Sequence, residues 1–392
     1  MELSRLSAQR VFSRNRKLID RVLDQVEKKN ENTVDLTGST VDENVFDPQA
    51  LKASSSRMMN AIGKEAMQYS GSHDYMPLKA EIAERYEGFG IHVQDKDFTI
   101  TNGSTQAVDL ICKVLVNDGD AILVDAPLHW RYLQAISMYR PEVLEVPVLS
   151  DGPDLEQLEK QLKAGKAHVY FSAPNGQDPT GVVWSIEKRE KTASLMNEYG
   201  CILIELDRCG ELIAPEKRPS YMKELLGDQC VLIGSFSPTL GPGLRIGWIC
   251  ATDEEIARYS TEAKQKTDSH ANGYIQRVLW QYLKDYDYDR HVCQVRAVYE
   301  EKRTLVDALL EEYGVHRSVE QSAGNSIWLR LKKGKTGEEA FDAALQQGVL
   351  ILPGEICSLS GSTENYIAVD YSGSDRSGME KALEILKDLV RE

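Results

Sequence analysis

A chain of 392 residues exceeds the length at which one hydrophobic core usually keeps growing, so we expect a large and a small domain. Its 46 basic and 61 acidic residues give a net charge of −15, which argues against a nucleic-acid-binding surface. No apolar run reaches membrane-spanning length and the N-terminus lacks the apolar core of a signal peptide, so we expect a cytoplasmic location. The seven cysteines lack metal-ligand spacing, which predicts buried thiols and no metal site.

The N-terminal stretch predicts a helix followed by an extended arm. Apolar residues recur at helical spacing within residues 1–30, at Ile19, Val22, Leu23 and Val26. Residues 34–39 then form an extended segment. Farther on, a turn-rich stretch containing Tyr69 leads into an amphipathic helix. On sequence alone, Tyr69 suits packing as well as ligand binding.

Short apolar runs predict buried strands at 98–101, 121–124, 168–172, 201–205 and 230–233. After the first run, Gly103-Ser104-Thr105 leads into a helix over residues 107–115. A helix N-terminus presents free N–H groups and a positive dipole end to an anion, although the same residues also suit an ordinary helix cap. Together with Ser235 and Arg245 farther along, this turn favours an anion site.

The segment that carries the most information is the loop at residues 234–248, which follows the last of these strands and is rich in Ser, Gly and Pro. It closely resembles the cofactor loop of the fold-type I pyridoxal-phosphate (PLP) enzymes, the class I and II aminotransferases. In that family Ser-x-Ser-Lys precedes Gly-Pro-Gly-Leu-Arg-x-Gly, and the lysine forms a Schiff base with PLP. This chain has Pro238 at the lysine position, and proline has no side-chain amine.

The resemblance extends from about residue 33 to 388 and carries expectations for the cofactor site. It implies a phosphate site formed by Ser104, Thr105, Ser235 and Arg245. It also places Tyr69 where the family reaches across a dimer interface to the neighbouring subunit's phosphate. Where the family stacks an aromatic residue on the cofactor ring, this chain has His129 beside Trp130. A histidine there can stack or act as an acid or base, and a histidine outside the site is the alternative.

Residues that perform the family's chemistry are replaced at five positions, at Leu206, Pro238, Asp178, Cys209 and Ala368. Leu206 replaces the aspartate that keeps the ring nitrogen protonated, so the ring would lose electron-withdrawing strength. Asp178 and Cys209 replace the asparagine and tyrosine that contact the phenolic oxygen, and an ionised Asp178 would repel a phenolate. Ala368 replaces the arginine that clamps the substrate carboxylate, which predicts poor binding of ordinary amino acids.

These replacements lead us to expect an aminotransferase-fold enzyme that has lost aldimine-forming chemistry. It would use lysine-independent acid–base catalysis, such as a cyclisation, isomerisation or elimination in biosynthesis, with the catalytic residues His129, Asp207, Cys209 and Asp178. We expect no covalent PLP. A non-covalently held PLP, pyridoxamine phosphate (PMP) or other phosphate-bearing ligand would contact Ser104, Thr105, Ser235, Arg245, Tyr69 and Trp130. The alternatives are a non-catalytic protein that binds cofactor or a partner, and a residual aminotransferase with non-covalent cofactor.

The resemblance also implies the fold class, α/β, with an aminotransferase-like large domain that contains a mostly parallel sheet and a small α/β C-terminal domain. We expect an N-terminal helix and arm over residues 1–45, the large domain over 46–288 and the small domain over 289–392. The family further implies a homodimer that binds a small molecule and neither nucleic acid nor membrane.

Overall fold

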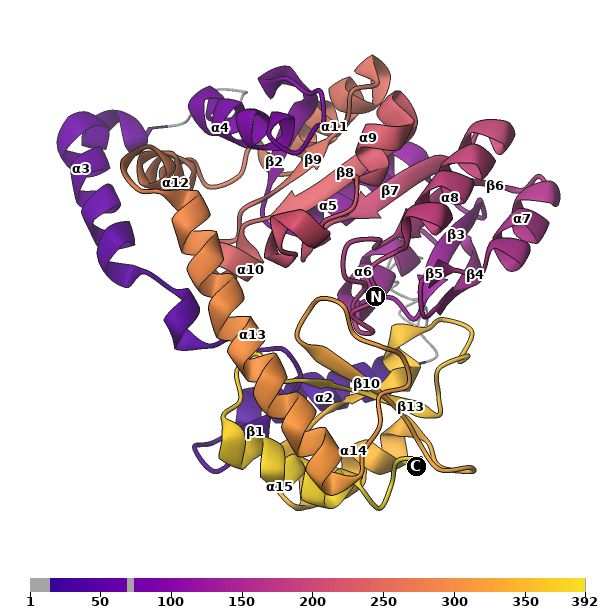
Figure 1. Ribbon diagram of the computed structural model, residues 1–392. Coiled ribbons are helices and arrows are strands. Elements are labelled where there is room, and N and C mark those ends of the chain that lie inside the picture. The colour runs from indigo at the N-terminus through magenta and orange to yellow at the C-terminus, as the bar shows by residue number, and fades with distance from the viewer. Residues whose placement is uncertain (1–14, 69–73, 392) are drawn as a thin grey trace, which may run out of the picture.

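The computed structural model describes residues 15–68 and 74–391, and its largest element is an eight-stranded sheet with the strand order β2-β9-β8-β7-β6-β3-β4-β5 (Figure 1). The strands are β2 (Phe98–Thr101), β3 (Ala121–Ala126), β4 (Glu142–Leu149), β5 (Gly152–Pro153), β6 (Ala167–Ser172), β7 (Ile202–Leu206), β8 (Cys230–Ser235) and β9 (Gly247–Cys250). Strands β8, β7, β6, β3 and β4 pair in parallel. Strand β9 is antiparallel to both of its neighbours, and β5 is antiparallel to β4. The mostly parallel sheet predicted from the sequence is therefore confirmed.

Helices cover both faces of this sheet, as parallel sheets require. One face packs against α5 (Ser104–Leu115), α6 (Trp130–Ser137) and α11 (Glu254–Asp268). The opposite face packs against α7 (Leu155–Lys163), α8 (Ile186–Tyr199) and α9 (Met222–Leu226). Around β2 and β9 lie α4 (Met76–Glu87) and α12 (Gly273–Asp285), with α3 (Pro48–Ala66) packed on α12. Because side chains alternate along a strand, Ile204 and Leu206 face α5 whereas Leu203 faces α8 and α9.

A second core forms from both ends of the chain. Its antiparallel sheet contains β10 (Ser326–Arg330), β13 (Tyr366–Asp370) and β12 (Leu352–Pro353), packed with α14 (Gly337–Gln346) and α15 (Arg376–Leu386). The N-terminal helix α2 (Arg16–Lys28) buries its apolar stripe in the same core, through Leu18, Ile19 and Val22. The short strand β1 (Val34–Asp35) pairs in parallel with β11 (Val349–Leu350).

Helix α13 (Tyr288–Tyr313), orange in Figure 1, connects the two cores. Its first turns place Tyr288 and Val292 in the core beside β2 and β9, and its last turns place Val306 and Leu309 in the core of the small sheet. The helix passes from one core to the other without a linker, so the division at residues 288 and 289 stays a prediction. None of the described helices combines the length and the apolar character needed to cross a membrane.

Candidate active site

The residues predicted to bind cofactor come from loops at one edge of the large sheet. Strands β3, β6, β7 and β8 are parallel, so the loops that follow them leave the sheet at the same edge. Strand β2 runs in the same direction as β8, because both are antiparallel to β9, so α5 starts at this edge too. In α/β proteins, ligands bind outside the carboxyl ends of such strands.

The N-terminus of α5 and the side chain of Arg245 form a cradle for an anion. Gly103 has φ 87° and packs so closely on Arg245 that a Cβ at this position would lie 2.6 Å from its Nη2. The same Nη2 donates to the carbonyl of Asn102 at 3.0 Å. Ser104 begins the helix and accepts a hydrogen bond from the Tyr132 hydroxyl at 2.9 Å. The free N–H groups of the first turn therefore open next to a guanidinium, an arrangement that fits a phosphate.

The loop after β8 lies beside the start of α5, because Ser235 pairs with Gly247, and a Cβ at Gly247 would lie 2.8 Å from the backbone nitrogen of Ser104. The backbone N–H of Ser237 donates to Ser235 Oγ at 3.1 Å. Within the part of the chain that the structure describes, Arg245 makes no ion pair with an acidic side chain, so its positive charge is available to a ligand. Thr105 follows Ser104 in the first turn of α5. Tyr69 lies outside the described residues, so its predicted contact with phosphate stays a prediction.

A second cluster brings together three of the predicted catalytic residues, His129, Asp178 and Cys209, around Arg208. Arg208 Nη1 forms an ion pair with Asp178 Oδ2, so this carboxylate is neutralised by a guanidinium. Burial lowers the pKa of His129 to about 3. Its Nδ1 accepts from the N–H of Arg131 at 3.3 Å, which leaves the proton of the neutral ring on Nε2. Burial raises the pKa of the Cys209 thiol to about 12, so it is protonated at neutral pH.

The fourth predicted catalytic residue, Asp207, is close enough for its charge to act on Cys209 but makes its hydrogen bonds outside this cluster. Its Oδ1 accepts from the N–H of Gly210 at 2.8 Å and lies 3.4 Å from Asn175 Nδ2, which also donates to Glu205. Asp207 thus shares its surroundings with Glu205, whereas Leu206 between them packs toward α5. Burial, and next the charge of Glu205, raise the pKa of Asp207 to about 7.

Pro238 lies in the short helix α10 (Ser237–Leu240), directly after β8. Two lysines that are near this loop in sequence are occupied elsewhere. Lys223 Nζ donates to the carbonyl oxygens of Gly227 at 2.9 Å and Cys230 at 2.6 Å, and Lys264 pairs with Asp268 on α11. Neither of them is part of the loop that contains Pro238.

Trp130, predicted to contact the cofactor, is 5% exposed and packs in the hydrophobic core of the small domain. The guanidinium of Arg131 covers its ring at 4.2 Å from the centroid. Ala368 is fully buried in the middle strand β13, opposite Trp328 and Leu352.

Sequence reasoning missed several charged residues in and around the Arg208 cluster. Arg208 lies inside a motif that we interpreted through its neighbours, and Arg131 follows directly after the predicted ring contacts. Asp370 faces the same cluster, and burial raises its pKa to about 6, although its Oδ1 accepts the N–H of Ser372 at 2.8 Å. The signal for Arg131 and Arg208 was that each stands inside a loop that we had already matched to a family motif.

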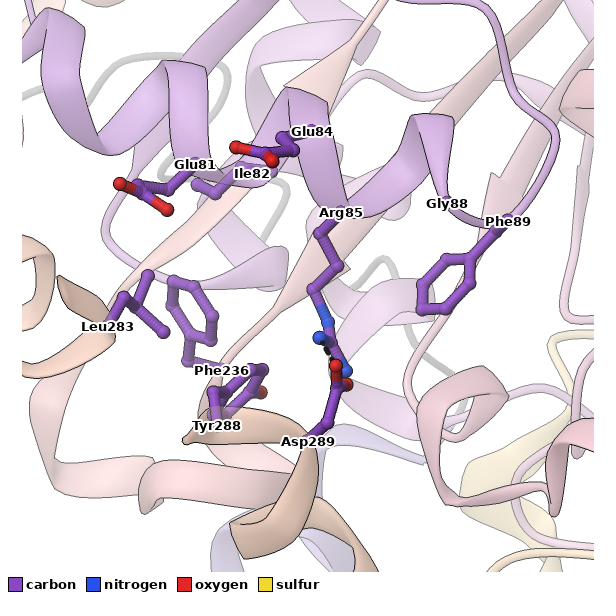
Figure 2. Close-up of a pocket in the computed structure, with 10 residues that line it drawn as sticks. All are labelled: Glu81, Ile82, Glu84, Arg85, Gly88, Phe89, Phe236, Leu283, Tyr288 and Asp289. Carbon is purple, nitrogen blue, oxygen red and sulfur yellow. Dashed lines mark hydrogen bonds and ion pairs between the residues drawn. The ribbon is translucent and has the colours of Figure 1, made fainter. Parts of the chain in front are cut away.

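A surface pocket lies behind the cofactor loop, between α4, α12 and α13 (Figure 2). Phe236 and Tyr288 line it, and Figure 2 shows the guanidinium of Arg85 reaching Asp289, with Nη1 2.8 Å from the carboxylate. Tyr288 also donates to Glu211 at 3.0 Å, and Glu211 pairs with Arg85. None of the predicted site residues lines this pocket, and Phe236 is the residue of the loop 234–248 that does.

The sheet, the phosphate cradle and the small C-terminal domain define the fold-type I class of PLP enzymes. The chain belongs to the class I and II aminotransferase family, whose model matches residues 36–386. It is 31% identical to the 2-aminoadipate transaminase of Thermus thermophilus over 341 residues, which cover 86% of this chain and 84% of the relative. A solved structure of kynurenine aminotransferase from Pyrococcus horikoshii, in complex with PMP, superposes with a TM-score of 0.89 at 28% identity and covers 98% of this chain and 97% of its own. The α-aminoadipate aminotransferase from Thermus thermophilus gives 0.86 at 29% identity and covers 93% of each chain.

These comparisons contradict the expectation that the site takes no covalent PLP. The family binds this cofactor covalently, and the Thermus thermophilus structure holds N-(5'-phosphopyridoxyl)-L-leucine, in which the cofactor is bonded to the nitrogen of an amino acid. The expectation considered only bonds to side chains of this chain, at residue 238 or at another lysine. The amine of an amino acid offers the cofactor another covalent partner, and a proline at position 238 leaves that partner available.

Proposed function

We propose that this chain is a repurposed enzyme of the aminotransferase family, which binds a phosphopyridoxyl cofactor and transfers protons through groups other than a lysine at position 238. The observation that carries the proposal is the complete phosphate cradle beside a changed ring site. Gly103, Ser104 and Arg245 retain close mutual packing, whereas Leu206, Asp178 and Cys209 have replaced the ring contacts. When bound, the cofactor withdraws electrons from an attached amino acid, and Leu206 weakens this effect because it cannot stabilise a charged ring nitrogen.

The chain's own residues divide this work. The first turn of α5 and Arg245 hold the phosphate, with Ser235 beside them. Neutral His129 can donate a hydrogen bond from Nε2, although a pKa of about 3 makes it a poor base. Among the acidic groups of the Arg208 cluster, Asp370 has a pKa raised to about 6, which suits it to hold or release a proton near neutral pH. Isomerisation, elimination and cyclisation all require such a proton transfer.

The test separates cofactor binding from proton transfer. Titration calorimetry should detect PMP binding to the wild-type protein and a loss of about tenfold or more in the Arg245→Met variant, because a charge-assisted contact to phosphate is removed. With PLP, a panel of amino acids and heavy water, NMR should detect exchange of the α-proton above the rate of free PLP. The Asp370→Asn variant should retain PMP binding and slow the exchange. If wild-type protein fails to bind PMP, the proposal is wrong.

A non-catalytic binding protein is the second candidate. It is favoured by the pKa values of His129 and Cys209, about 3 and about 12, which remove two predicted proton carriers from the neutral range. It predicts PMP binding with a rise in melting temperature and no α-proton exchange. A cytoplasmic homodimer remains our expectation from the family, and sedimentation of the purified protein tests the dimer.

A further inference from the structure

Two guanidinium groups, those of Arg131 and Arg208, lie close to the phosphate cradle without being part of it. Arg245 and Arg208 both lie near enough to Arg131 to lower its pKa, after the larger effect of burial. Within the described residues, neither Arg131 nor Arg245 makes an ion pair with an acidic side chain. The Arg208 guanidinium has one, Asp178. Asp370 also faces Arg208, but within the described residues no ion pair joins these two side chains, so Arg131 and Arg208 can together hold a further anionic group.

The family's carboxylate clamp cannot supply this second site here. Position 368 is an alanine with no exposed surface, and it lies between Trp328 and Leu352 on the neighbouring strands. Arg208 comes from a different element, the loop after β7, at the same edge of the sheet as the phosphate cradle. Its side chain is 35% exposed, so it is accessible from the surface of the molecule.

We propose that Arg208, with Arg131 beside it, binds the carboxylate of an amino-acid or keto-acid substrate in place of the missing arginine at position 368. This inference rests on the proposed function, because it assumes that a phosphopyridoxyl group occupies the cradle at Arg245. The guanidinium fork donates two parallel hydrogen bonds to a carboxylate. Asp178 is the internal counter-ion that holds Arg208 when no substrate is bound, and it competes with the substrate carboxylate.

The experiment compares two probes that differ only in one carboxylate. N-(5'-phosphopyridoxyl)-L-leucine carries it, and N-(5'-phosphopyridoxyl)-3-methylbutylamine has hydrogen in its place. The ratio of their dissociation constants, measured by calorimetry at fixed salt, reports the carboxylate contact alone. We expect the wild-type protein to prefer the carboxylate probe by about tenfold or more, and Arg208→Met to lose about tenfold of that preference while its affinity for the amine probe stays unchanged.

Two further variants sharpen the assignment. Asp178→Asn removes the competing anion and should increase the preference by about threefold, the opposite direction to Arg208→Met. Arg258→Met, a charge removal on the exposed face of α11, is the matched control and should leave the ratio unchanged. If Arg208→Met does not fold, Arg208→Lys keeps the charge without the planar fork and should lose part of the preference.

The outcomes distinguish this inference from the proposed function. Failure of the wild-type protein to bind either probe or PMP would overturn the proposed function, and this inference with it. Tight PMP binding together with an unchanged probe ratio in Arg208→Met and Arg208→Lys would overturn the carboxylate assignment alone.

Discussion

Arg245 lies against the backbone of Gly103, with its Nη2 at 2.6 Å from the point that a Cβ at position 103 would occupy. The glycine therefore has two roles, since it also adopts φ 87°, a conformation that other residues rarely take. The contact keeps the guanidinium at the N-terminus of α5.

The variant Gly103→Ala should displace Arg245 and weaken PMP binding by about tenfold. Backbone strain should also lower the free energy of unfolding by about 1 kcal/mol. Gly119→Ala is the control, because Gly119 has φ 84° and a Cβ at position 119 would meet no other atom within 4 Å. It should show the same loss of stability, measured by urea unfolding, and full affinity in calorimetry. Equal losses of affinity in both variants would contradict the role of the Arg245 contact.

Asp207→Asn should stabilise the protein more at pH 8 than at pH 5. The pKa of Asp207 is raised from 3.8 to about 7, so between these values the folded state holds a proton that the unfolded state has released. Stability therefore falls as pH rises through this window, by an amount on the order of a few kcal/mol. Asparagine removes the charge and keeps the oxygen that accepts from Gly210.

Urea unfolding at both pH values tests this expectation. The Asp207→Asn variant should also retain α-proton exchange, because Asp207 lies with Glu205 and not with Arg208. A larger loss of stability at pH 8 than at pH 5 would show that the Asp207 charge is stabilising instead.

Iodoacetamide at pH 8 should modify Cys293 well before Cys209. Cys293 is the exposed cysteine among the seven, whereas Cys209 is 9% exposed and its thiol pKa is raised to about 12. The thiolate is the reactive form, so a high pKa suppresses alkylation by orders of magnitude. Mass spectrometry of tryptic peptides at short times measures the order. Early alkylation of Cys209 would contradict the raised pKa of its thiol and restore it as a candidate proton carrier.

Pro238→Lys should place an amine on α10, next to the cradle at Ser235 and Ser237. After incubation with PLP and borohydride reduction, peptide mapping should find the phosphopyridoxyl group at position 238. Pro238→Ala controls for the loss of proline, which restricts the residue before it and lacks an N–H donor. Absence of the adduct in Pro238→Lys, with PMP binding intact, would mean that α10 directs residue 238 away from the cofactor.

The sequence supported the fold and the phosphate cradle because both depend on local patterns. Apolar runs followed by Gly-Ser-Thr or Ser-rich turns identify strand, loop and helix within a few residues of one another. The alternation of side chains along a strand could also have separated Asp207 from Leu206, but we grouped residues by their motif.

The ion pair between Arg208 and Asp178 could not be predicted in the same way. These residues are 30 positions apart and come from the loops after β7 and β6, and their contact depends on how two loops pack. The low pKa of His129 likewise could not be predicted, because it results from burial that arises only in the folded chain.

Helix α13 links the small domain mechanically to the loop that contains Pro238. The same helix that ends in the small core holds Thr239 from its first turns, through the Tyr288 hydroxyl at 2.7 Å and through His291 Nε2, 2.7 Å from the Thr239 carbonyl. Any rotation of the small domain must therefore bend α13 or shift the residue that follows Pro238. A movement of the small domain on substrate binding would therefore be transmitted through α13 to Thr239.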